Sequence, residues 1–187
     1  MLKRFSALLI LLVGFFVVSS VSLSAQNLSA SDSGRVANST IDRKVRKEIL
    51  SLPYYGVFDA IDYQINGDTV TLSGYTVRPL TKSDAEDAVK DVTGVRNVVN
   101  KIQVLPLSPS DDRIRVRTYN ALANAGSLYR YLLGSSPAIH IIVNNGHVRL
   151  AGFVNSQGDK DLANITAREI FGVFDVTNDL QVENQQR

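Results

Sequence analysis

The sequence predicts an α+β fold made of two tandem αββαβ units, each a small three-stranded mixed sheet covered on one face by two helices. Three observations support this prediction. Residues 70–104 recur at 148–182 without a gap after a shift of 78 positions. Each copy has alternating apolar and polar residues around an Asn-Gly step, which is typical of a β-hairpin. Each hairpin is followed by a helical stripe of small apolar residues and another strand, so the chain is a tandem repeat.

The first 25 residues have the pattern of a cleaved secretory signal. Lys3 and Arg4 form a basic segment, Phe5 to Val18 an apolar segment, and small residues follow up to Ala25. The apolar run is short compared with the roughly 20 residues that a membrane span requires. We therefore expect a periplasmic protein that carries a signal peptide over residues 1–25. Retention of the segment as an N-terminal anchor is the alternative.

Composition narrows the function classes further. The chain has no cysteine, which excludes disulfides, thiol chemistry and an acylated cysteine behind the signal. It has 20 Lys and Arg against 18 Asp and Glu, and removal of Lys3 and Arg4 with the signal leaves the two signs equal. A nucleic-acid-binding protein would have a basic excess, so nucleic acid is not an expected partner.

The first unit is predicted to span residues 41–104, after a flexible leader over residues 26–40. Ile41, Val45, Ile49 and Leu52 form one stripe of an amphipathic helix, which Pro53 ends. The other side of this helix carries basic residues, namely Arg43, Lys44, Arg46 and Lys47.

The register of each hairpin follows from its alternation, because only one register places every apolar side chain on the same face. The expected pairs are 61 with 74, 63 with 72 and 65 with 70 in the first unit, and 139 with 152, 141 with 150 and 143 with 148 in the second. Gly74 lies on the covered face, where it is predicted to let the following helix approach closely.

The second helix of the first unit is predicted to begin with the capping-box spacing of Ser83 to Glu86. Its small residues Ala85, Ala88, Val89 and Val92 form a narrow stripe that can lie close on a sheet. Gly94 is expected at its C-cap, before a last strand over residues 98–104.

Residues 105–110 form a predicted Pro/Ser linker, and the second unit spans residues 111–183. Ser127 to Leu133 has no clear counterpart in the first unit and is expected to extend the helix or to form an extra turn. Small units bury little apolar surface, so the two copies are expected to pack together.

The sequence predicts no catalytic or metal constellation. His140 and His147 fall on the outer face of the second hairpin, and about four strand residues, roughly 13 Å, separate their positions. This separation is too large for one metal ion, so both are interpreted as surface residues. The glycines are expected at turns and caps, and no phosphate loop or serine elbow is present. We expect a protein that is not an enzyme and that uses no cofactor or metal.

Basic and aromatic residues gather in the part of the second unit that differs most from the first. The candidate binding residues are Arg113, Arg117, Tyr129, Arg130 and Tyr131, with Arg115, Leu132 and Leu133 beside them. Basic side chains next to Tyr and Leu on an amphipathic helix favour an anionic lipid surface. The alternative is that Tyr129, Leu132 and Leu133 pack between the two copies while the arginines are only solvated.

Both copies resemble the BON domain, a family named for bacterial osmotically inducible and nodulation proteins. The resemblance rests on INGDTVTLSGY and AEDAVKDVTGVRNVVNKIQV in the first copy, and more loosely on NNGHVRLAGFV and ITAREIFGVFDVTNDLQV in the second. It covers roughly residues 41–104 and 112–183.

The resemblance implies a periplasmic or outer-membrane-associated protein, without catalytic activity, that binds phospholipid or envelope surfaces. Such proteins support envelope integrity under osmotic or envelope stress, and envelope proteins are further expected partners. In dual-domain relatives the first helix of the second domain contacts lipid, which maps by position onto Arg113 to Tyr131. The absence of a lipidated cysteine departs from anchored relatives. A protein-interaction or chaperone-like module that uses sheet edges or the groove between the copies is the alternative function.

Overall fold

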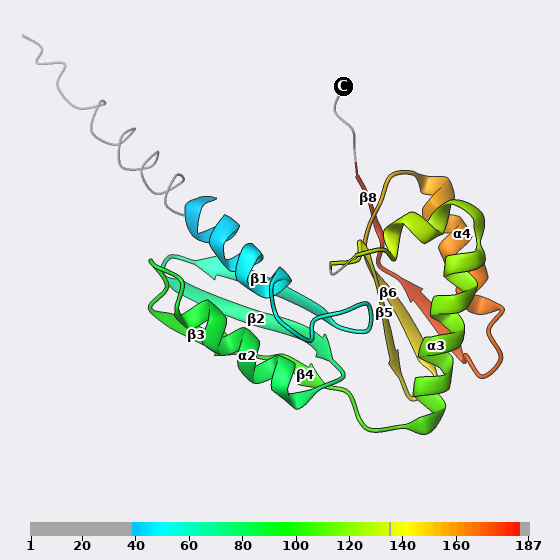
Figure 1. Ribbon diagram of the computed structural model, residues 1–187, viewed down its shortest axis with the longest axis horizontal. Coiled ribbons are helices and arrows are strands. Elements are labelled where there is room, and N and C mark those ends of the chain that lie inside the picture. The colour runs from blue at the N-terminus through cyan, green and yellow to red at the C-terminus, as the bar shows by residue number, and fades with distance from the viewer. Residues whose placement is uncertain (1–38, 135, 184–187) are drawn as a thin grey trace, which may run out of the picture.

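A computed structural model describes residues 39–134 and 136–183, which form two units packed against each other (Figure 1). The expected signal, residues 1–25, lies outside the described residues, as does the leader except for residues 39 and 40. No helix in the described part of the chain is both long enough and apolar enough to cross a membrane.

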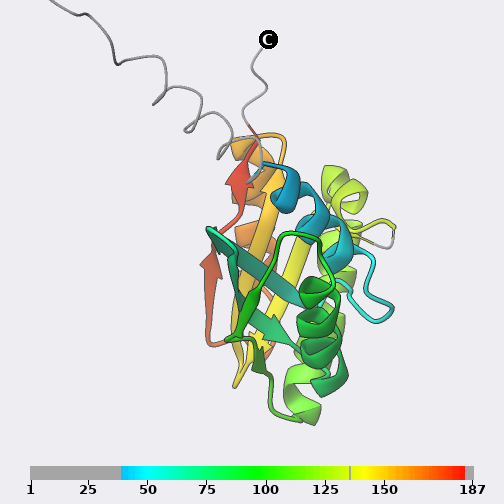
Figure 2. The same ribbon diagram turned by 90° about the vertical axis from the view of Figure 1, so that its left-hand side faces the viewer.

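The first unit consists of two helices on one face of a mixed sheet (Figure 2). Its elements are a helix over residues 39–50, β1 (Ala60–Asn66), β2 (Thr69–Thr76), α2 (Pro79–Lys90), β3 (Asn97–Asn100) and β4 (Gln103–Val104). The strand β2 is central. It pairs antiparallel with β1 on one side and parallel with β3 and β4 on the other.

The second unit repeats this arrangement with one addition. Its elements are α3 (Pro109–Asn124), the 3-10 helix η1 (Gly126–Tyr131), β5 (Ile139–Asn144), β6 (His147–Val154), α4 (Gln157–Arg168), β7 (Asp175–Asn178) and β8 (Gln181–Val182). Here β6 is central, with β5 antiparallel and β7 and β8 parallel to it. The predicted α+β fold of two αββαβ units is confirmed, and η1 is the extra turn expected after the first helix.

Both hairpins have the register that the alternation predicts. The pairs are Ile61↔Gly74, Tyr63↔Leu72 and Ile65↔Val70 in the first unit, and Ile139↔Gly152, Ile141↔Leu150 and Val143↔Val148 in the second. The central strands supply fully buried residues to each core, among them Val70, Leu72 and Leu150. The hydrophobic pattern thus determines the register of each hairpin, because a slip of one residue would turn the apolar face of a strand towards solvent.

An asparagine side chain interrupts the last strand of each unit and separates β3 from β4 and β7 from β8. The Oδ1 atom of Asn100 accepts a hydrogen bond from the Ile102 N–H at 3.0 Å, and its Nδ2 atom donates to the Lys82 carbonyl at 3.0 Å. Asn178 makes the equivalent bonds to Leu180 at 3.2 Å and to Lys160 at 2.8 Å. The repeated asparagine therefore fastens the last strand to the second helix of its unit.

The capping box predicted for α2 is wrong. The helix begins at Pro79, whose fixed φ suits the first position of a helix, and Arg78 is the N-cap residue. Ser83 lies inside the helix and its hydroxyl donates to the Leu80 carbonyl. The helix ends at the C-cap Asp91, so Gly94 lies beyond the cap, in the turn before β3.

Gly74 and Gly152 are required by the neighbouring strand. They have φ values of 114° and 112°. A Cβ atom would lie 2.1 Å from the Ala60 carbonyl oxygen at the first position and 2.0 Å from that of Ala138 at the second. The prediction that Gly74 makes room for the following helix is wrong, because the backbone of β1 occupies this space.

The two units pack together through the loop between the first helix and β1. Val57 and Phe58 pack against the core of the second unit, and the Phe58 and Tyr119 rings lie 6.4 Å apart. The Ile141 N–H donates to the Val57 carbonyl at 2.7 Å. The expected contact between copies is confirmed, but Leu132 belongs to the core of its own unit, and Tyr129 and Leu133 are about half exposed.

This packing covers one of the two histidines. The side chain of His140 is only 9% exposed, its Nδ1 atom lies 3.3 Å from the Gly56 carbonyl oxygen, and its ring lies 5.4 Å from that of Tyr55. Burial lowers the pKa of His140 below its ordinary value. The interpretation of His140 as a surface residue is wrong, because the first unit covers that part of the outer face. His147 stays exposed, beside Asp175.

Replacement of Gly74 by Ala is expected to lower the free energy of unfolding by more than about 2 kcal/mol. The new Cβ would combine a left-handed φ with a clash against the Ala60 carbonyl. Gly56→Ala is the matched control, since no atom lies within 4 Å of its Cβ position, and it should stay within about 0.5 kcal/mol of wild type. Chemical denaturation measures both changes, and equal stability of the two variants would contradict this account.

Candidate functional site

The five candidate binding residues lie at two separate places. Arg113 and Arg117 are on the exposed side of α3, near its beginning. Tyr129, Arg130 and Tyr131 belong to η1, which follows the other end of α3. A helix of 16 residues is about 24 Å long. The structure therefore does not bring the predicted set together into one surface.

Arg130 and Tyr131 hold η1 to the beginning of α4. The carboxylate of Asp159 accepts hydrogen bonds from the Arg130 guanidinium at 2.9 Å and from the Tyr131 hydroxyl at 2.9 Å. The Tyr131 hydroxyl in turn accepts from the Asn155 N–H at 2.9 Å. Tyr131 is buried, whereas Tyr129 is 51% exposed. The geometry gives Arg130 and Tyr131 a packing role within the second unit.

Asp159 is the centre of this polar cluster. Besides the hydrogen bonds from Arg130 and Tyr131, its carboxylate accepts hydrogen bonds from the hydroxyls of Ser127 and Ser156. These donors, with the Ser127 bond as the largest cause, hold the pKa of Asp159 at about 2. The carboxylate is thus ionised at neutral pH, and its hydrogen bonds hold η1 against the beginning of α4.

The beginning of α3 is fixed to the second hairpin by two buried charged residues. The Asp111 carboxylate accepts from the Asn145 N–H and the Gly146 N–H, each at 2.9 Å. Arg115 is 4% exposed, donates to the Val143 carbonyl at 2.7 Å and pairs with Asp112. The sequence placed Arg115 among the exposed basic residues. That placement is wrong, because the guanidinium satisfies an edge carbonyl of β5.

Two exposed phenylalanines lie at this end of the second unit, in the loop between α4 and β7. Phe171 is 85% exposed and Phe174 is 78% exposed. The Phe174 N–H donates to the Gly146 carbonyl at 2.9 Å, which holds the loop against the hairpin turn. Arg117 donates to the Phe171 carbonyl at 3.3 Å, with its guanidinium carbon 5.9 Å from the ring centre.

These contacts join α3 and the loop between α4 and β7 into one surface, which we call the aromatic tip. It consists of Arg113, Val116 and Arg117 on α3 and of Phe171 and Phe174 in the following loop. Figure 1 shows that the beginning of α3, the turn between β5 and β6 and the loop between α4 and β7 lie at the same end of the second unit. Val116 adds a half-exposed apolar side chain between the two arginines.

The sequence-based site prediction missed the two phenylalanines, although a comparison of the copies could have found them. A shift of 78 positions places Phe171 on Thr93 and Phe174 on Arg96. The backbone is the same at both places, since the Arg96 N–H donates to the Asp68 carbonyl at 2.8 Å just as Phe174 does to Gly146. The second unit therefore has two exposed aromatic residues where the equivalent loop of the first unit has two polar ones.

The aromatic tip carries two arginines. Three nearby acids have partners, since Asp111 caps the hairpin, Asp112 pairs with Arg115 and Asp175 lies against His147. Within residues 39–134 and 136–183, Arg113 and Arg117 form no salt bridge. The same described residues contain no group of three or more His, Asp or Glu that could hold a metal ion. The surface can offer apolar rings and positive charge to a partner.

Residues 37–106 and 110–184 each match the family model of the BON domain. The osmotically-inducible protein Y of Escherichia coli strain K12 is 30% identical over 128 residues, which cover 66% of this chain and 62% of that protein.

Two solved structures of CdsD, a structural protein of the type III secretion system of Chlamydia trachomatis, were also found. They are 12% and 13% identical and cover 75% and 78% of this chain, and 96% and 94% of those chains. Their TM-score of 0.30 is too low to carry a comparison of function.

Asp159→Asn is expected to lower the free energy of unfolding by about 2 kcal/mol at neutral pH, because it removes a charged acceptor of several hydrogen bonds. The folded pKa of Asp159 is about 2, below its ordinary value of 3.8. The stability that the ionised group contributes is therefore fully present above about pH 4 and lost as the pH falls towards 2. Denaturant unfolding of both proteins between pH 7 and pH 2 measures this difference.

Asp161→Asn is the control for that experiment, since Asp161 is exposed on the same helix. It should change stability by less than about 0.5 kcal/mol at any pH. A difference between wild type and Asp159→Asn that does not shrink in acid would show that the charge of Asp159 is not what holds η1 to α4.

Proposed function

This chain belongs to the BON-domain family, and we propose that it is a non-enzymatic periplasmic protein that associates with anionic phospholipid surfaces of the cell envelope. The aromatic tip carries this proposal, because exposed aromatic rings lie there beside two arginines that form no salt bridge with any described residue. We further propose that this association supports envelope integrity under osmotic stress. The E. coli relative, whose name describes osmotic induction, supports this part of the proposal.

The exposure of Phe171 and Phe174 needs a physical reason. Two rings that are 85% and 78% exposed contribute little to the core of the second unit. Their contact with water is unfavourable, and large exposed apolar groups on a small domain mark interaction surfaces. A lipid surface fits such rings, since apolar side chains of peripheral proteins enter the boundary between headgroups and acyl chains.

The two arginines fit the same partner. Arg113 and Arg117 project from the exposed side of α3, next to the rings, where they would lie at headgroup level if the rings enter the membrane. Anionic headgroups attract basic residues close to the surface, and salt screens this attraction. Since the protein has no overall basic excess once the signal is removed, binding should depend on these positions and not on net charge.

Co-sedimentation with vesicles tests this proposal. The mature protein should sediment with vesicles of phosphatidylcholine and phosphatidylglycerol at low salt, and less at high salt or with phosphatidylcholine alone. The double variant Phe171→Ser with Phe174→Ser should bind about tenfold more weakly, since two apolar rings are lost. The double variant Arg113→Glu with Arg117→Glu should lose a similar factor.

Lys44→Glu with Lys47→Glu is the matched control, because it changes the net charge equally on the exposed face of the first helix. It should reduce binding less than twofold if the aromatic tip is the contact. Circular dichroism establishes that each variant is folded. An equal loss in the control, or no sedimentation of wild type at low salt, would contradict the proposal.

A further inference from the structure

The outer edge of the second sheet is closed by other parts of the chain. In a hairpin with a two-residue turn, every second residue directs its N–H and C=O away from the partner strand, and on β5 these are Ile139, Ile141 and Val143. The Ile141 N–H donates to the Val57 carbonyl at 2.7 Å. The Val143 carbonyl accepts from the Arg115 guanidinium at 2.7 Å. Each contact removes an edge group that another chain could bind.

The equivalent edge of the first sheet has no such closure. A shift of 78 positions turns the outward residues of β5 into Ile61, Tyr63 and Ile65, which we call the open edge. The Ile61 N–H faces the Tyr55 hydroxyl at 3.5 Å, a long hydrogen bond. In the described part of the chain, no hydrogen-bond partner corresponds to Val57 at Tyr63 or to Arg115 at Ile65.

A single residue explains the difference at Ile65. The first helices of the two units align with a shift of 73 positions, because Ile41 packs beside Gly94 as Ile114 does beside Gly172. This alignment places Asp42 where the second unit has Arg115. A carboxylate accepts hydrogen bonds and cannot donate one to a carbonyl, and Asp42 instead accepts from the Tyr63 hydroxyl at 2.9 Å.

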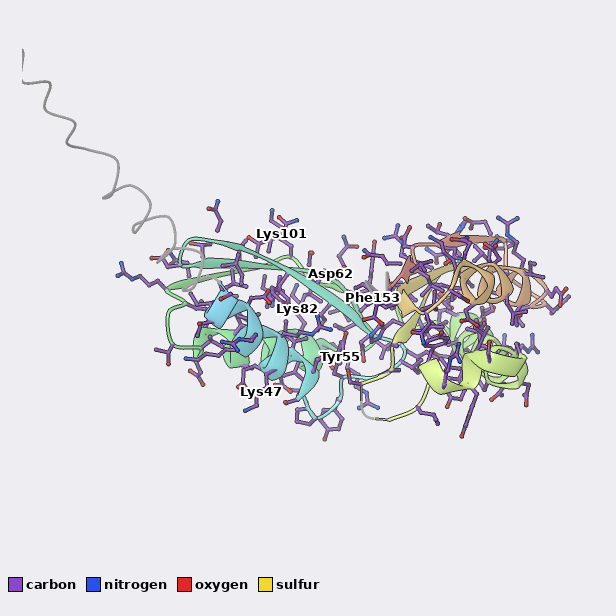
Figure 3. All side chains as sticks on the ribbon, turned by 90° about the horizontal axis from the view of Figure 1, so that it is seen from above. Lys47, Tyr55, Asp62, Lys82, Lys101 and Phe153 are labelled. Carbon is purple, nitrogen blue, oxygen red and sulfur yellow. The ribbon has the colours of Figure 1, made fainter. Side chains whose placement is uncertain are left out.

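Two cavities lie along the open edge. One of about 440 Å³ is lined by Arg46, Leu50, Tyr55 and β1 residues including Asp62, and across the junction by Phe153 of β6. The other, of about 360 Å³, lies beside Asp42 and Ile65. Tyr63 lines both, so they follow one strand edge. Figure 3 shows Tyr55, Asp62 and Phe153 at the junction of the two units.

We propose that the open edge of β1 binds an extended polypeptide segment of a partner protein by strand addition. Its outward backbone groups have the spacing that another strand requires. At β5 the protein already satisfies one outward edge group with its own chain, because the carbonyl of Val57, in the turn before β1, accepts from the Ile141 N–H. From Ile61 to Ile65 the edge is about 13 Å long and fits four or five residues.

The surroundings define the chemistry of that segment. Leu50 and Phe153 offer apolar contact to its side chains, and Phe153 is 45% exposed. The cavity beside the edge is lined by charges of both signs, from Arg46, Asp62 and Glu183, so a segment without strong net charge fits best. This site lies along β1 and at the junction of the two units, and it shares no residue with the aromatic tip, so either proposal can fail without the other.

Asp42→Arg tests the inference, because it places in the first unit the residue type, Arg115, that closes the sheet edge of the second unit. The new guanidinium occupies the position of Arg115 and is expected to bind the Ile65 carbonyl. Asp42→Ala is the control, because it also loses the Tyr63 contact but leaves the edge open. The probe is a fluorescein-labelled hexapeptide, Thr-Val-Thr-Val-Thr-Lys, and a twin with N-methyl groups on alternate residues cannot pair with a strand edge.

Fluorescence anisotropy with the full mature protein should show saturable binding of the hexapeptide to wild type and Asp42→Ala. Asp42→Arg and the N-methylated twin should each weaken it by about tenfold, as expected for the loss of edge hydrogen bonds. Equal binding of the twin, equal binding by Asp42→Arg, or no binding up to about 1 mM peptide would overturn the proposal. Wild type that sediments as a dimer, with Asp42→Arg a monomer, would make a second copy the occupant and would also overturn it.

Discussion

The hydrogen bond between the Ile141 N–H and the Val57 carbonyl joins the two units, and much of the structure depends on it. It fixes the loop of the first unit on the edge of β5, so that Val57 and Phe58 reach the core of the second unit. It also brings Gly56 and Tyr55 over His140. A small unit without disulfides buries little apolar surface by itself, so this shared core stabilises both.

A comparison of equivalent positions in the two units distinguishes residues that the fold requires from residues that can differ. Asn100 and Asn178 fasten the last strand in the same way, and Gly74 and Gly152 accommodate the same strand backbone. Those positions are equal in both copies because the scaffold requires them. The positions that differ have changed the surface instead. At the aromatic tip, Phe171 and Phe174 occupy the positions that Thr93 and Arg96 have in the first unit. Arg115 closes the edge of the second sheet, whereas its counterpart Asp42 leaves the edge of the first sheet open.

The sheet registers could be predicted because they depend on neighbours in the sequence. Alternation over a few residues decides which face is buried, and the structure has all six expected pairs. The beginning of α2 was missed because Pro79, one turn earlier, begins the helix more strongly than the serine in the capping-box pattern.

The site was harder to predict because its contacts are distant in sequence. The bond of Arg130 to Asp159 and the burial of His140 by Gly56 join residues that no local pattern relates. The sequence grouped Arg130 and Tyr131 with Arg117 by composition, whereas the fold turns the first two towards α4. The difference between the copies was the better guide, and it indicates both the aromatic tip and the open edge.

The most direct test of the account is the environment of the aromatic tip at a membrane. The chain has no tryptophan, so Phe171→Trp introduces a single tryptophan at the aromatic tip, which can be excited selectively. With anionic vesicles its emission should shift to the blue and be quenched by brominated acyl chains. Tyr54→Trp, on a half-exposed residue of the first unit, should show neither effect. Equal quenching at both positions, or none at Phe171→Trp while the protein is bound, would contradict the account.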